Sequence, residues 1–459
     1  MNQFGQIINT INDFVWGKYM LIFLVGTGIY ITLGLKGRTI TKIKQALKML
    51  WAGRDKDSFG GEGDISPFQV MMTSLAGTVG TGNIAGVATA IFLGGPGAVF
   101  WMWITALFGM ALKFGEAVLS VKYRIKQESG PNAGEFAGGP MYYIKNGMGE
   151  SWDWLAKAFC LFTIGASLLG IGSTIQANSI ARAVEKSFSI PYWLTGIILS
   201  ILVYTVIIGG IKRIAEVTEK VVPIMASLYL LASLTVIFLN ISELGAAFSL
   251  IFESAFSGHA AVGGFAGAAV IQVIRYGVSR GVFSNEAGLG SSAIAHGATT
   301  TDSSVKQGIV GMLGGFIDTI VICTMTALVI IMTGVWSSGA TGAKLTTEAF
   351  NTGLPGSGNI VVGIGLIFFA FSTMLTWAYY GEKATEYLFG PKGIMPFRYI
   401  FVIVVFIGSI TGLDLVWDLG SMMNGLMLIP NLIALLVLSP KIFEAANDYF
   451  RKEKQEQNK

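Results

Sequence analysis

A run of small and polar residues interrupts one of the longest apolar stretches of the chain. The stretch covers residues 68–93, and its middle reads Ala76-Gly77-Thr78-Val79-Gly80-Thr81-Gly82-Asn83. Each glycine costs about 1 kcal/mol relative to alanine inside a helix, so this run weakens the helix. An interrupted helix offers bare amide donors from one half and bare carbonyl acceptors from the other. Amides suit a carboxylate and carbonyls suit a cation, so the run predicts a binding site for both.

A second irregular stretch lies near the end of a later apolar run. It reads Arg275-Tyr276-Gly277-Val278-Ser279-Arg280-Gly281, and we expect this helix to be interrupted around Gly277. Glycine is common in membrane helices and lets them approach closely, so either stretch alone could be a packing surface. Two interruptions at corresponding positions favour the binding interpretation, because discontinuous helices form the central site of many transporters.

The composition indicates that the chain is embedded in a bilayer. Of its 459 residues, 53% are hydrophobic and only 13% are charged, which leaves too little polar surface for a soluble protein of this length. A helix of about 20 apolar residues spans the hydrocarbon core. We expect about eleven such spans, at residues 19–35, 68–93, 98–121, 154–177, 192–208, 221–239, 263–282, 307–332, 360–380, 399–410 and 415–438.

Basic residues predict how these spans are oriented. Positive charge is retained on the cytoplasmic side, and the richest clusters lie in residues 36–56 and in the tail after residue 438. An odd number of spans puts both clusters on one side, so we expect a cytoplasmic carboxyl terminus and an amino terminus outside. The inner loops then also carry Lys122, Arg124, Lys126, Lys212, Arg213, Lys220, Lys383 and Lys392, and the outer ones keep Lys18, Arg182, Lys186 and Lys344. Basic charge spread over so many loops does not indicate nucleic-acid binding.

The order of the spans predicts an internal repeat. Spans two to six and seven to eleven form two sets of five helices, and an odd number inverts the second set across the membrane. The predicted divisions are an extra first helix with its basic connection (1–66), two five-helix repeats (67–240 and 241–440) and a cytoplasmic tail (441–459). The two halves show no clear match in sequence, so the repeat depends on span order alone.

Two motifs beside the interruptions resemble a known family. One is Gly94-Gly95-Pro96-Gly97-Ala98-Val99-Phe100-Trp101-Met102-Trp103, and the other is Arg280-Gly281-Val282-Phe283-Ser284-Asn285-Glu286-Ala287-Gly288. With the run at 77–83 they resemble the sodium:alanine (alanine or glycine:cation) symporter family over nearly the whole chain. The resemblance implies an all-helical leucine-transporter-type fold with one extra helix before a ten-helix core. It also implies symport of alanine or glycine with sodium across the cell membrane by alternating access, with no other cofactor.

The resemblance further implies which residues bind the solute and the ion. Amides around Thr78 to Gly82 would hold the solute carboxylate, and the carbonyls of Ala76 and Val79 would face sodium. Hydroxyl groups on the ninth span would complete the ion site, since sodium prefers hard oxygen ligands. The predicted sodium ligands are Ala76, Val79, Ser372 and Thr373. The predicted solute-binding residues are Thr78, Gly80, Thr81, Gly82, Asn83, Ser173, Gln176, Gly277, Thr373 and Trp377.

Three of these residues, Ser173, Gln176 and Trp377, also have a purely structural interpretation. Ser173 and Gln176 lie three residues apart, on one face of the predicted fourth span, and could reach the solute. Trp377 follows Thr373 by one turn and could cap the pocket. Serine, threonine and glutamine also join membrane helices by hydrogen bonds, and tryptophan often anchors a helix at the interface.

Ionisable residues inside the spans are further candidates. Asp318 lies within the eighth span, where a carboxylate is either functional or hydrogen-bonded to neighbouring helices. Lys113 and Glu116 are spaced to pair on one helix face. Arg275 and Arg280 with Glu286 could form an inner gate of ion pairs. Both cysteines, Cys160 and Cys323, lie in apolar segments, and we expect them to be free.

Three other functions were weighed. A proton-coupled permease of the same fold differs only in its ion, and both histidines, His259 and His296, fall near helix ends, where they suit a buried proton relay poorly. An ion channel would need a selectivity filter or a ring of charges, and neither is visible. A membrane enzyme is not expected, because the chain has no His-Glu-x-x-His motif and no credible nucleophile elbow.

Overall fold

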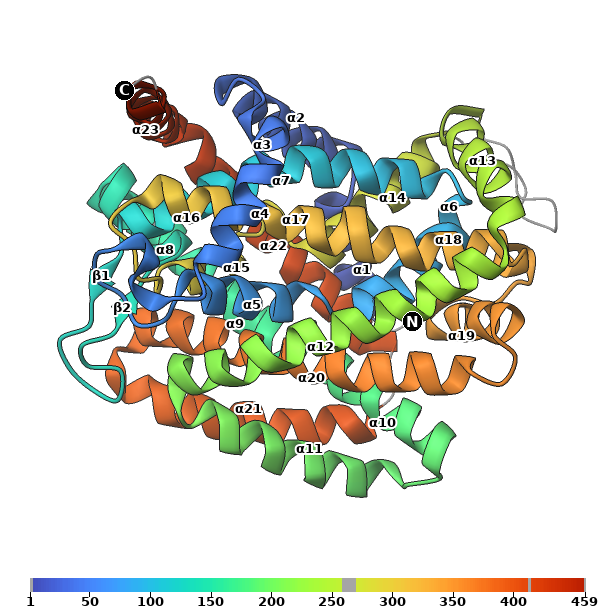
Figure 1. Cartoon of the computed structure of the whole chain (residues 1–459). Coiled ribbons are helices and arrows are strands. Elements are labelled where there is room, and N and C mark those ends of the chain that lie inside the picture. The colour runs from blue at the N-terminus through green and yellow to red at the C-terminus, as the bar shows by residue number, and fades with distance from the viewer. Residues whose placement is uncertain (1–2, 258–269, 412–413, 458–459) are drawn as a thin grey trace.

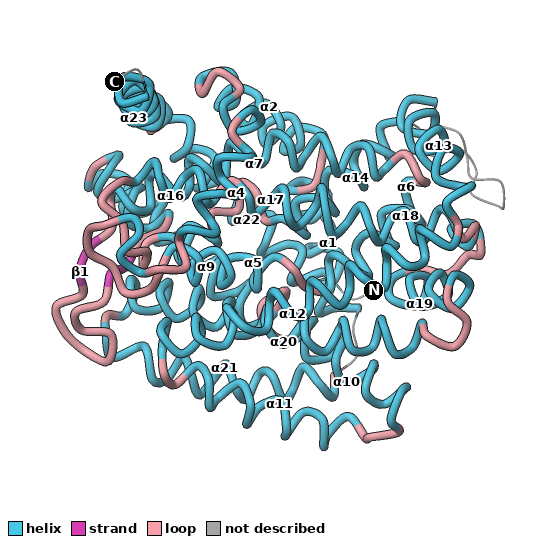
Figure 2. The backbone as a smooth tube through the Cα atoms, in the orientation of Figure 1, coloured by secondary structure: helices cyan, strands magenta, loops and turns pink. Residues whose placement is uncertain are grey.

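Helices make up nearly all of the chain that the computed structural model describes, which is residues 3–257, 270–411 and 414–457 (Figure 2). Most of the long helices run lengthwise between two ends of the molecule (Figure 1). One end carries the antiparallel pair β1 (Ile125–Lys126) and β2 (Phe136–Ala137), and we call it the hairpin end. The opposite end carries α13 (Leu244–Ser257) and α19 (Gly342–Gly353), and we call it the α19 end.

Helices of spanning length agree with the predicted spans. Among the described residues, eight helical stretches are long and apolar enough to cross a bilayer, and a bent pair makes nine. α11 (Tyr192–Ile207) is a shorter apolar helix. The predicted span 263–282 begins outside the described residues, and α14 (Val270–Asn285) is its described part. The unbroken spans are α2 (Lys18–Gly34), α7 (Ala98–Lys122), α12 (Gly210–Leu239), α20 (Gly358–Phe389), α21 (Ile394–Ile410) and α22 (Asp414–Val437).

Shorter helices connect and cover the spans. α1 (Gln3–Val15) precedes α2 and packs against α22. The connections and the carboxyl-terminal helix are α3 (Arg38–Thr41), α4 (Ile43–Ala52), α8 (Pro140–Tyr143) and α23 (Ser439–Gln457). In Figure 1, α23 and the strands lie at the hairpin end, away from α13 and α19. The basic connections and the basic tail therefore gather at one end of the bundle.

The second predicted span is broken, as expected. α5 (Pro67–Thr78) begins with a capping box, in which Ser66 Oγ accepts from Gln69 N and Gln69 Oε1 accepts from Ser66 N, both at 3.1 Å. The helix stops at Thr78, and a π-helical turn, η2 (Gly82–Gly86), leads into α6 (Val87–Gly94). The two halves are bent by 50°. All residues from 70 to 84 are buried, so the break lies inside protein, where its backbone groups can find partners.

The second predicted break is in the wrong place. α14 runs without interruption through residues 275–281 and ends at Asn285, and the irregular segment is 286–290, before α15 (Ser291–His296). A Cβ on Gly277 would lie 2.5 Å from the Ala98 carbonyl oxygen and 2.6 Å from the Trp101 Cβ. Gly277 therefore lets α14 approach α7 closely, which is the packing role that glycine often has between membrane helices.

Two more predicted spans are irregular. The fourth consists of α9 (Asp153–Leu169) and α10 (Thr174–Phe188), which are separated by residues 170–173. The eighth consists of α16 (Ser304–Gly311), α17 (Leu313–Gly315), the π-helical turn η6 (Phe316–Cys323) and α18 (Thr324–Met332). π-Helical turns are rare and are frequent at functional sites. The turns η2 and η6 contact each other.

Candidate functional site

The break after α5 is short and sharply defined. The amide of Val79 still donates to the Leu75 carbonyl, at 2.7 Å. The next amide, Gly80 N, donates instead to the side chain of Asn83, with Oδ1 at 2.9 Å. Val79 has an extended ψ of 90°, which turns the chain out of the helix. Unwinding is thus confined to Val79 and Gly80, whereas Thr78 remains helical and its hydroxyl bonds back to Leu75 O at 3.2 Å.

Helix α20 faces this break with hydroxyl groups. Thr373 Oγ1 donates to the Ala76 carbonyl at 2.9 Å, and Thr376 Oγ1 donates to the Thr73 carbonyl at 3.0 Å. A Cβ on Gly80 would lie 2.7 Å from Thr373 Oγ1. Thr373 therefore lies directly beside the broken helix, where it was predicted to bind sodium and the solute. Ser372 differs, because its hydroxyl turns toward α12, 3.6 Å from Met225 Sδ.

Helix α10 supplies Gln176 to the same place. A Cβ on Gly80 would lie 3.6 Å from Gln176 Nε2, which itself donates to the Ile171 carbonyl at 3.0 Å. Ser173 does not share its helix face, because Ser173 lies in the break before α10 and bonds Leu168 O at 2.6 Å. A glycine pair, Gly170 and Gly172, gave a signal for this break that the sequence interpretation missed.

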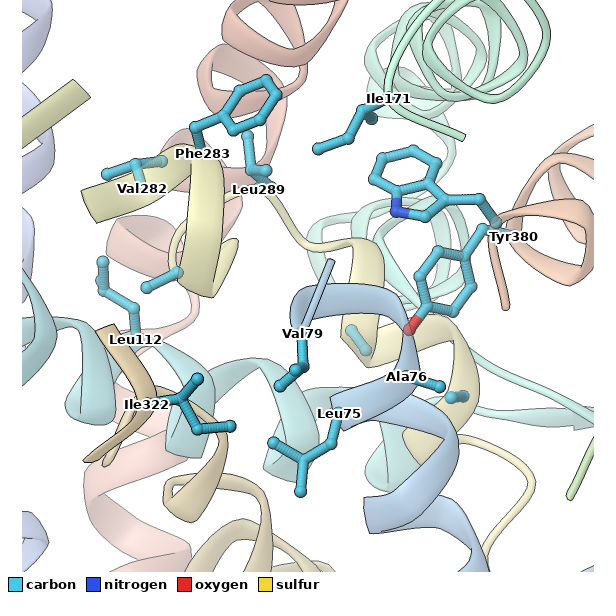
Figure 3. Close-up of a cluster of buried hydrophobic side chains, with 14 of the residues drawn as sticks. Leu75, Ala76, Val79, Leu112, Ile171, Val282, Phe283, Leu289, Ile322 and Tyr380 are labelled. Atoms are coloured by element: carbon cyan, nitrogen blue, oxygen red, sulfur yellow. The ribbon is translucent and has the colours of Figure 1, made fainter. Parts of the chain in front are cut away.

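Trp377 and Tyr380 lie beside the break on the α20 side. Both rings are buried and meet edge to face, with centroids 5.5 Å apart. Trp377 Nε1 donates to Glu286 Oε1 at 2.9 Å. Figure 3 shows the Tyr380 hydroxyl pointing toward the segment of Ala76 and Val79, with Ile171 and Phe283 farther from that segment. Because Trp377 is completely buried, it is not an interfacial anchor.

Asn83 ties the break to Asp318. Its Nδ2 donates to Asp318 Oδ1 at 2.7 Å, while its Oδ1 accepts from Gly80 N. The other carboxylate oxygen accepts from Ser284 Oγ at 2.9 Å and Thr319 Oγ1 at 2.7 Å. Asn83 lies in η2 and Asp318 in η6, so the side chain of Asn83 joins the two π-helical turns by hydrogen bonds. Asp318 therefore fixes the side chain that caps the broken helix.

The second break, residues 286–290, is held by side chains of α7 and α22. Glu116 Oε1 accepts from Gly288 N at 3.0 Å, Gly290 N at 3.2 Å and Asn431 Nδ2 at 2.8 Å. Lys113 Nζ donates to Ser292 Oγ at 3.0 Å. The predicted Lys113–Glu116 pair is wrong in detail, because both side chains bind the α14–α15 segment instead of each other.

The predicted ion-pair gate of Arg275, Arg280 and Glu286 is also wrong. Arg275 pairs with Asp13 at 2.7 Å. Glu286 bonds Trp377 and Ser291, and Arg280 makes no ion pair with any described residue. Both cysteines are free and buried, as expected. His259 lies outside the described residues, and His296 is buried with Nδ1 2.7 Å from Gln307 Nε2.

Several buried polar atoms around the first break have no hydrogen-bond partner among the described residues. They are Thr81 Oγ1, Gln176 Oε1 and the Tyr380 hydroxyl. More than nine in ten buried polar groups in proteins are hydrogen-bonded, so three such atoms near one break are unusual. They supply hydroxyl donors and an amide acceptor of the kind that an amino acid's carboxylate and ammonium groups require. Gly82, in contrast, packs on α14, since a Cβ there would lie 3.2 Å from Ser284 Cα.

A large cavity opens at the α19 end, directly beyond η2. Its volume is about 600 Å³, and we call it the vestibule. It is lined by Ala85, Gly86, Thr89, Ser179, Arg182, Ala183, Lys186, Arg280, Thr341, Gly342, Ala343, Lys344, Thr347, Asn359, Val362, Gly363, Leu366 and Trp417. The rings of Phe283 and Trp417 stack with centroids 5.7 Å apart. Trp417 lines the vestibule, so this ring pair lies at the vestibule wall.

The hairpin end is closed by buried ion pairs. Lys383 is fully buried and lies 3.0 Å from Glu386 and 3.8 Å from Glu135. Arg398 bonds Glu382 at 2.6 Å. Burial raises the pKa of Glu135, although the charge of Lys383 opposes the change. The structure therefore has a cavity on the α19 side of the break and a sealed network on the other side.

Comparison with known proteins identifies the family. The model of the sodium:alanine symporter family matches residues 1–459. The chain belongs to this family. It is 48% identical to a protein named sodium/alanine symporter AgcS from Methanococcus maripaludis, over 95% of each chain. It is 47% identical to an uncharacterized transporter of Haemophilus influenzae, over 97% of this chain and 96% of that one. Membership in the sodium:alanine symporter family confirms the prediction of a transporter in place of an enzyme.

Solved structures confirm the fold. The MhsT structure in complex with L-phenylalanine has a TM-score of 0.58 at 15% identity, and covers 83% of this chain and 90% of that one. A manganese transporter of Eremococcus coleocola has a TM-score of 0.51 at 16% identity, over 81% and 76% of the two chains. This member of the sodium:alanine symporter family therefore has the predicted leucine-transporter-type fold.

Proposed function

We propose that this protein moves small neutral amino acids, alanine and glycine above all, across the cell membrane together with sodium. The observation that carries the proposal is the break at Val79 and Gly80, faced by Thr373 and Gln176. Family membership supports the same function. In alternating access, one state of the transporter is open on one side of the binding site and closed on the other. The vestibule on one side of the break and the ion pairs on the other side agree with such a state.

The solute site is proposed between the broken helix, α10 and α20. The carboxylate would lie near Gly80, Thr81 and Tyr380, and the ammonium group near Gln176 Oε1. Trp377 and Tyr380 fill the space beyond the break with buried rings, so only a short side chain fits. One relative is named a sodium/alanine symporter, and alanine is such a small solute.

The sodium site is proposed at Ala76 and Thr373. A carbonyl and a hydroxyl meet there at 2.9 Å, and both are hard oxygen ligands. The Val79 carbonyl and the Ser372 hydroxyl would complete the site, for which Ser372 would have to rotate away from Met225. A lateral shift of α20 relative to α5 would change the number of ligands and so couple the ion to the conformation.

The positive-inside rule supports a cytoplasmic hairpin end. The tail helix α23 and the basic connections lie at that end, and the vestibule opens at the other, so the vestibule would face outside. The amino terminus would also be outside. The repeats are proposed at 67–240 and 241–440, with one broken helix near the start of each, between 1–66 and the tail 441–459.

A proton-coupled permease remains the second candidate. One relative, 36% identical over 98% of this chain, is named a putative sodium/proton-dependent alanine carrier protein in Bacillus subtilis. The buried carboxylate of Asp318 beside the break is the group that could carry a proton. A channel is a poorer candidate, since the network at the hairpin end closes any continuous path.

The decisive experiment is uptake of radiolabelled alanine into proteoliposomes. Sodium, potassium or choline is supplied outside at fixed pH, and only sodium should drive accumulation. Thr373→Ala and Thr78→Ala are measured beside the unmodified protein. We expect Thr373→Ala to lower uptake at least tenfold, and Thr78→Ala to have the smaller effect because its hydroxyl bonds within α5. Equal uptake with all three cations would contradict sodium coupling. Accumulation that follows a pH gradient alone would indicate the proton-coupled permease.

A further inference from the structure

The described walls of the vestibule carry four cations. Arg182, Lys186, Arg280 and Lys344 line it, and no carboxylate is among the described lining residues. Lys344 is partly compensated, since its Nζ lies 3.9 Å from Glu348 on the same helix. Arg182 bonds only the neutral amide of Asn178, with Nε and Oδ1 2.7 Å apart. The cavity therefore carries a net positive field in its described walls.

Arg280 is the vestibule cation that lies beside the Phe283 ring. It lies on α14, three residues before Phe283, and its guanidinium lies 5.8 Å from the centroid of that ring. Phe283 in turn stacks on Trp417, which also lines the vestibule. The Arg280 Nε is buried and has no hydrogen-bond partner among the described residues. A guanidinium presents five donors in a rigid fork, and leaving one buried without an acceptor is unfavourable.

From this geometry we propose that Arg280 is the centre of a second, weaker binding site in the vestibule, which takes a small carboxylate. The fork of Arg280 matches a carboxylate in two parallel hydrogen bonds, and Arg182 and Lys186 add attraction at longer range. The proposal rests on the transport function above, because the amino acid's own carboxylate is one source of the ligand. A free carboxylate without an ammonium group is the other source.

The site would act on the rate at which solute arrives. A cleft lined by one sign of charge raises the local concentration of the opposite charge and increases association rates. The Arg280 guanidinium lies beside the ring pair of Phe283 and Trp417 at the vestibule wall. A carboxylate bound to Arg280 would also draw the guanidinium away from the Phe283 ring. Removal of the Arg280 charge should therefore raise KM, and so lower kcat/KM, and leave the maximal uptake rate unchanged.

The test uses the purified full-length protein and two ligands. L-lactate is the free carboxylate, supplied as its sodium salt against sodium chloride at the same concentration, and L-alanine is the solute. The shift in thermal unfolding temperature is measured for each ligand with the unmodified protein, Arg280→Gln and Gly80→Ala. Arg275→Gln is the matched control, since Arg275 lies on the same helix, pairs with Asp13 and is outside the vestibule.

We expect a double dissociation. Arg280→Gln should lose the stabilisation by lactate and keep most of that by alanine, while Gly80→Ala should keep the lactate effect and retain only the weaker, vestibule part of the alanine effect. In uptake assays, kcat/KM for alanine should fall about threefold to tenfold in Arg280→Gln, and added choline chloride should reduce the difference. Arg275→Gln should behave like the unmodified protein.

Three results would overturn the inference. Lactate is not held at Arg280 if the shift survives in Arg280→Gln, and it binds the solute pocket instead if the shift disappears in Gly80→Ala. A fall in maximal rate with unchanged KM in Arg280→Gln would likewise show a conformational role without a carboxylate site. If the transport proposal itself were wrong, alanine would raise the unfolding temperature of neither the unmodified protein nor any variant.

Discussion

The two broken segments of this protein differ in how completely their polar groups are satisfied. The segment 286–290 is bonded by Glu116 and Asn431, and its Glu286 is bonded by Trp377 and Ser291. Of these groups, Glu116 Oε2 has no partner among the described residues. The break at Val79 and Gly80 has one side-chain cap, Asn83, and lies among three hydroxyl and amide atoms without described partners. From this comparison we propose that the second break is a fixed wall and that a ligand completes the structure at the first.

The largest effect on stability is expected when the segment 286–290 loses its hydrogen bonds to Glu116. Glu116→Ala would leave the amides of Gly288 and Gly290 without an acceptor, and each buried amide without a partner costs about 1–3 kcal/mol. We expect the free energy of unfolding to fall by about 3 kcal/mol or more, measured by thermal unfolding in detergent. Glu128→Gln, at an exposed position, is the control and should change little. A normal unfolding temperature in Glu116→Ala would remove the distinction between the two breaks.

A methyl group at the first break should abolish transport without unfolding the protein. In Gly80→Ala the new Cβ would lie 2.7 Å from Thr373 Oγ1 and would occupy the proposed solute site. Alanine uptake should fall more than tenfold in a protein that still folds, with the free energy of unfolding lower by about 1–3 kcal/mol because the buried Thr373 hydroxyl must shift. Gly86→Ala is a close control, because a Cβ there meets no atom within 4 Å. Normal uptake by Gly80→Ala would place the solute elsewhere.

Gly277 should affect stability and leave solute recognition alone. A Cβ there would meet the backbone of Ala98, so α14 and α7 must separate in Gly277→Ala. Overpacking of this kind costs about 1–3 kcal/mol. We expect a lower unfolding temperature with an unchanged KM for alanine in the protein that remains folded. A KM change without loss of stability would restore Gly277 to the solute site.

Trp377 should set the size of the solute, with the smallest effect on stability. Trp377→Phe removes the bond to Glu286 and shortens the ring, at a cost of about 1–2 kcal/mol. The wider pocket should admit larger neutral amino acids, so their uptake relative to alanine should rise about threefold to tenfold. Competition of unlabelled leucine or glutamine with labelled alanine measures this ratio. An unchanged ratio would mean that Trp377 does not limit solute size.

The sequence predicted the spans and the first break for a simple physical reason. Long apolar helices have few alternatives in lipid, and the glycines at 77, 80 and 82 are incompatible with a strong helix. The second break was misplaced because Arg275 to Gly281 has the same composition, although its glycine serves close packing of α14 on α7. The true break contains a glycine pair of its own, Gly288 and Gly290, both with positive φ. Its position is held by Glu116 and Asn431, which are far away in the sequence, so local composition did not distinguish it from 275–281.

The candidate site was predicted in part. Thr373 was predicted from the family resemblance and Gln176 as a polar residue of an apolar span, and both lie beside Gly80. The rotation of Ser372 toward Met225 and the break at 170–173 depend on contacts between helices and could not be read from spacing. Asp318 stood open between function and structure, and its bonds to Asn83 now give it a role in positioning the broken helix.

The most direct test of the account is equilibrium binding of radiolabelled alanine to the purified protein. It compares sodium with choline at equal ionic strength, for the unmodified protein and Gly80→Ala. We predict saturable binding that requires sodium and is lost in Gly80→Ala, with the fold intact by thermal unfolding. Binding of equal strength in choline, or full binding to Gly80→Ala, would contradict a shared solute and sodium site at the first break.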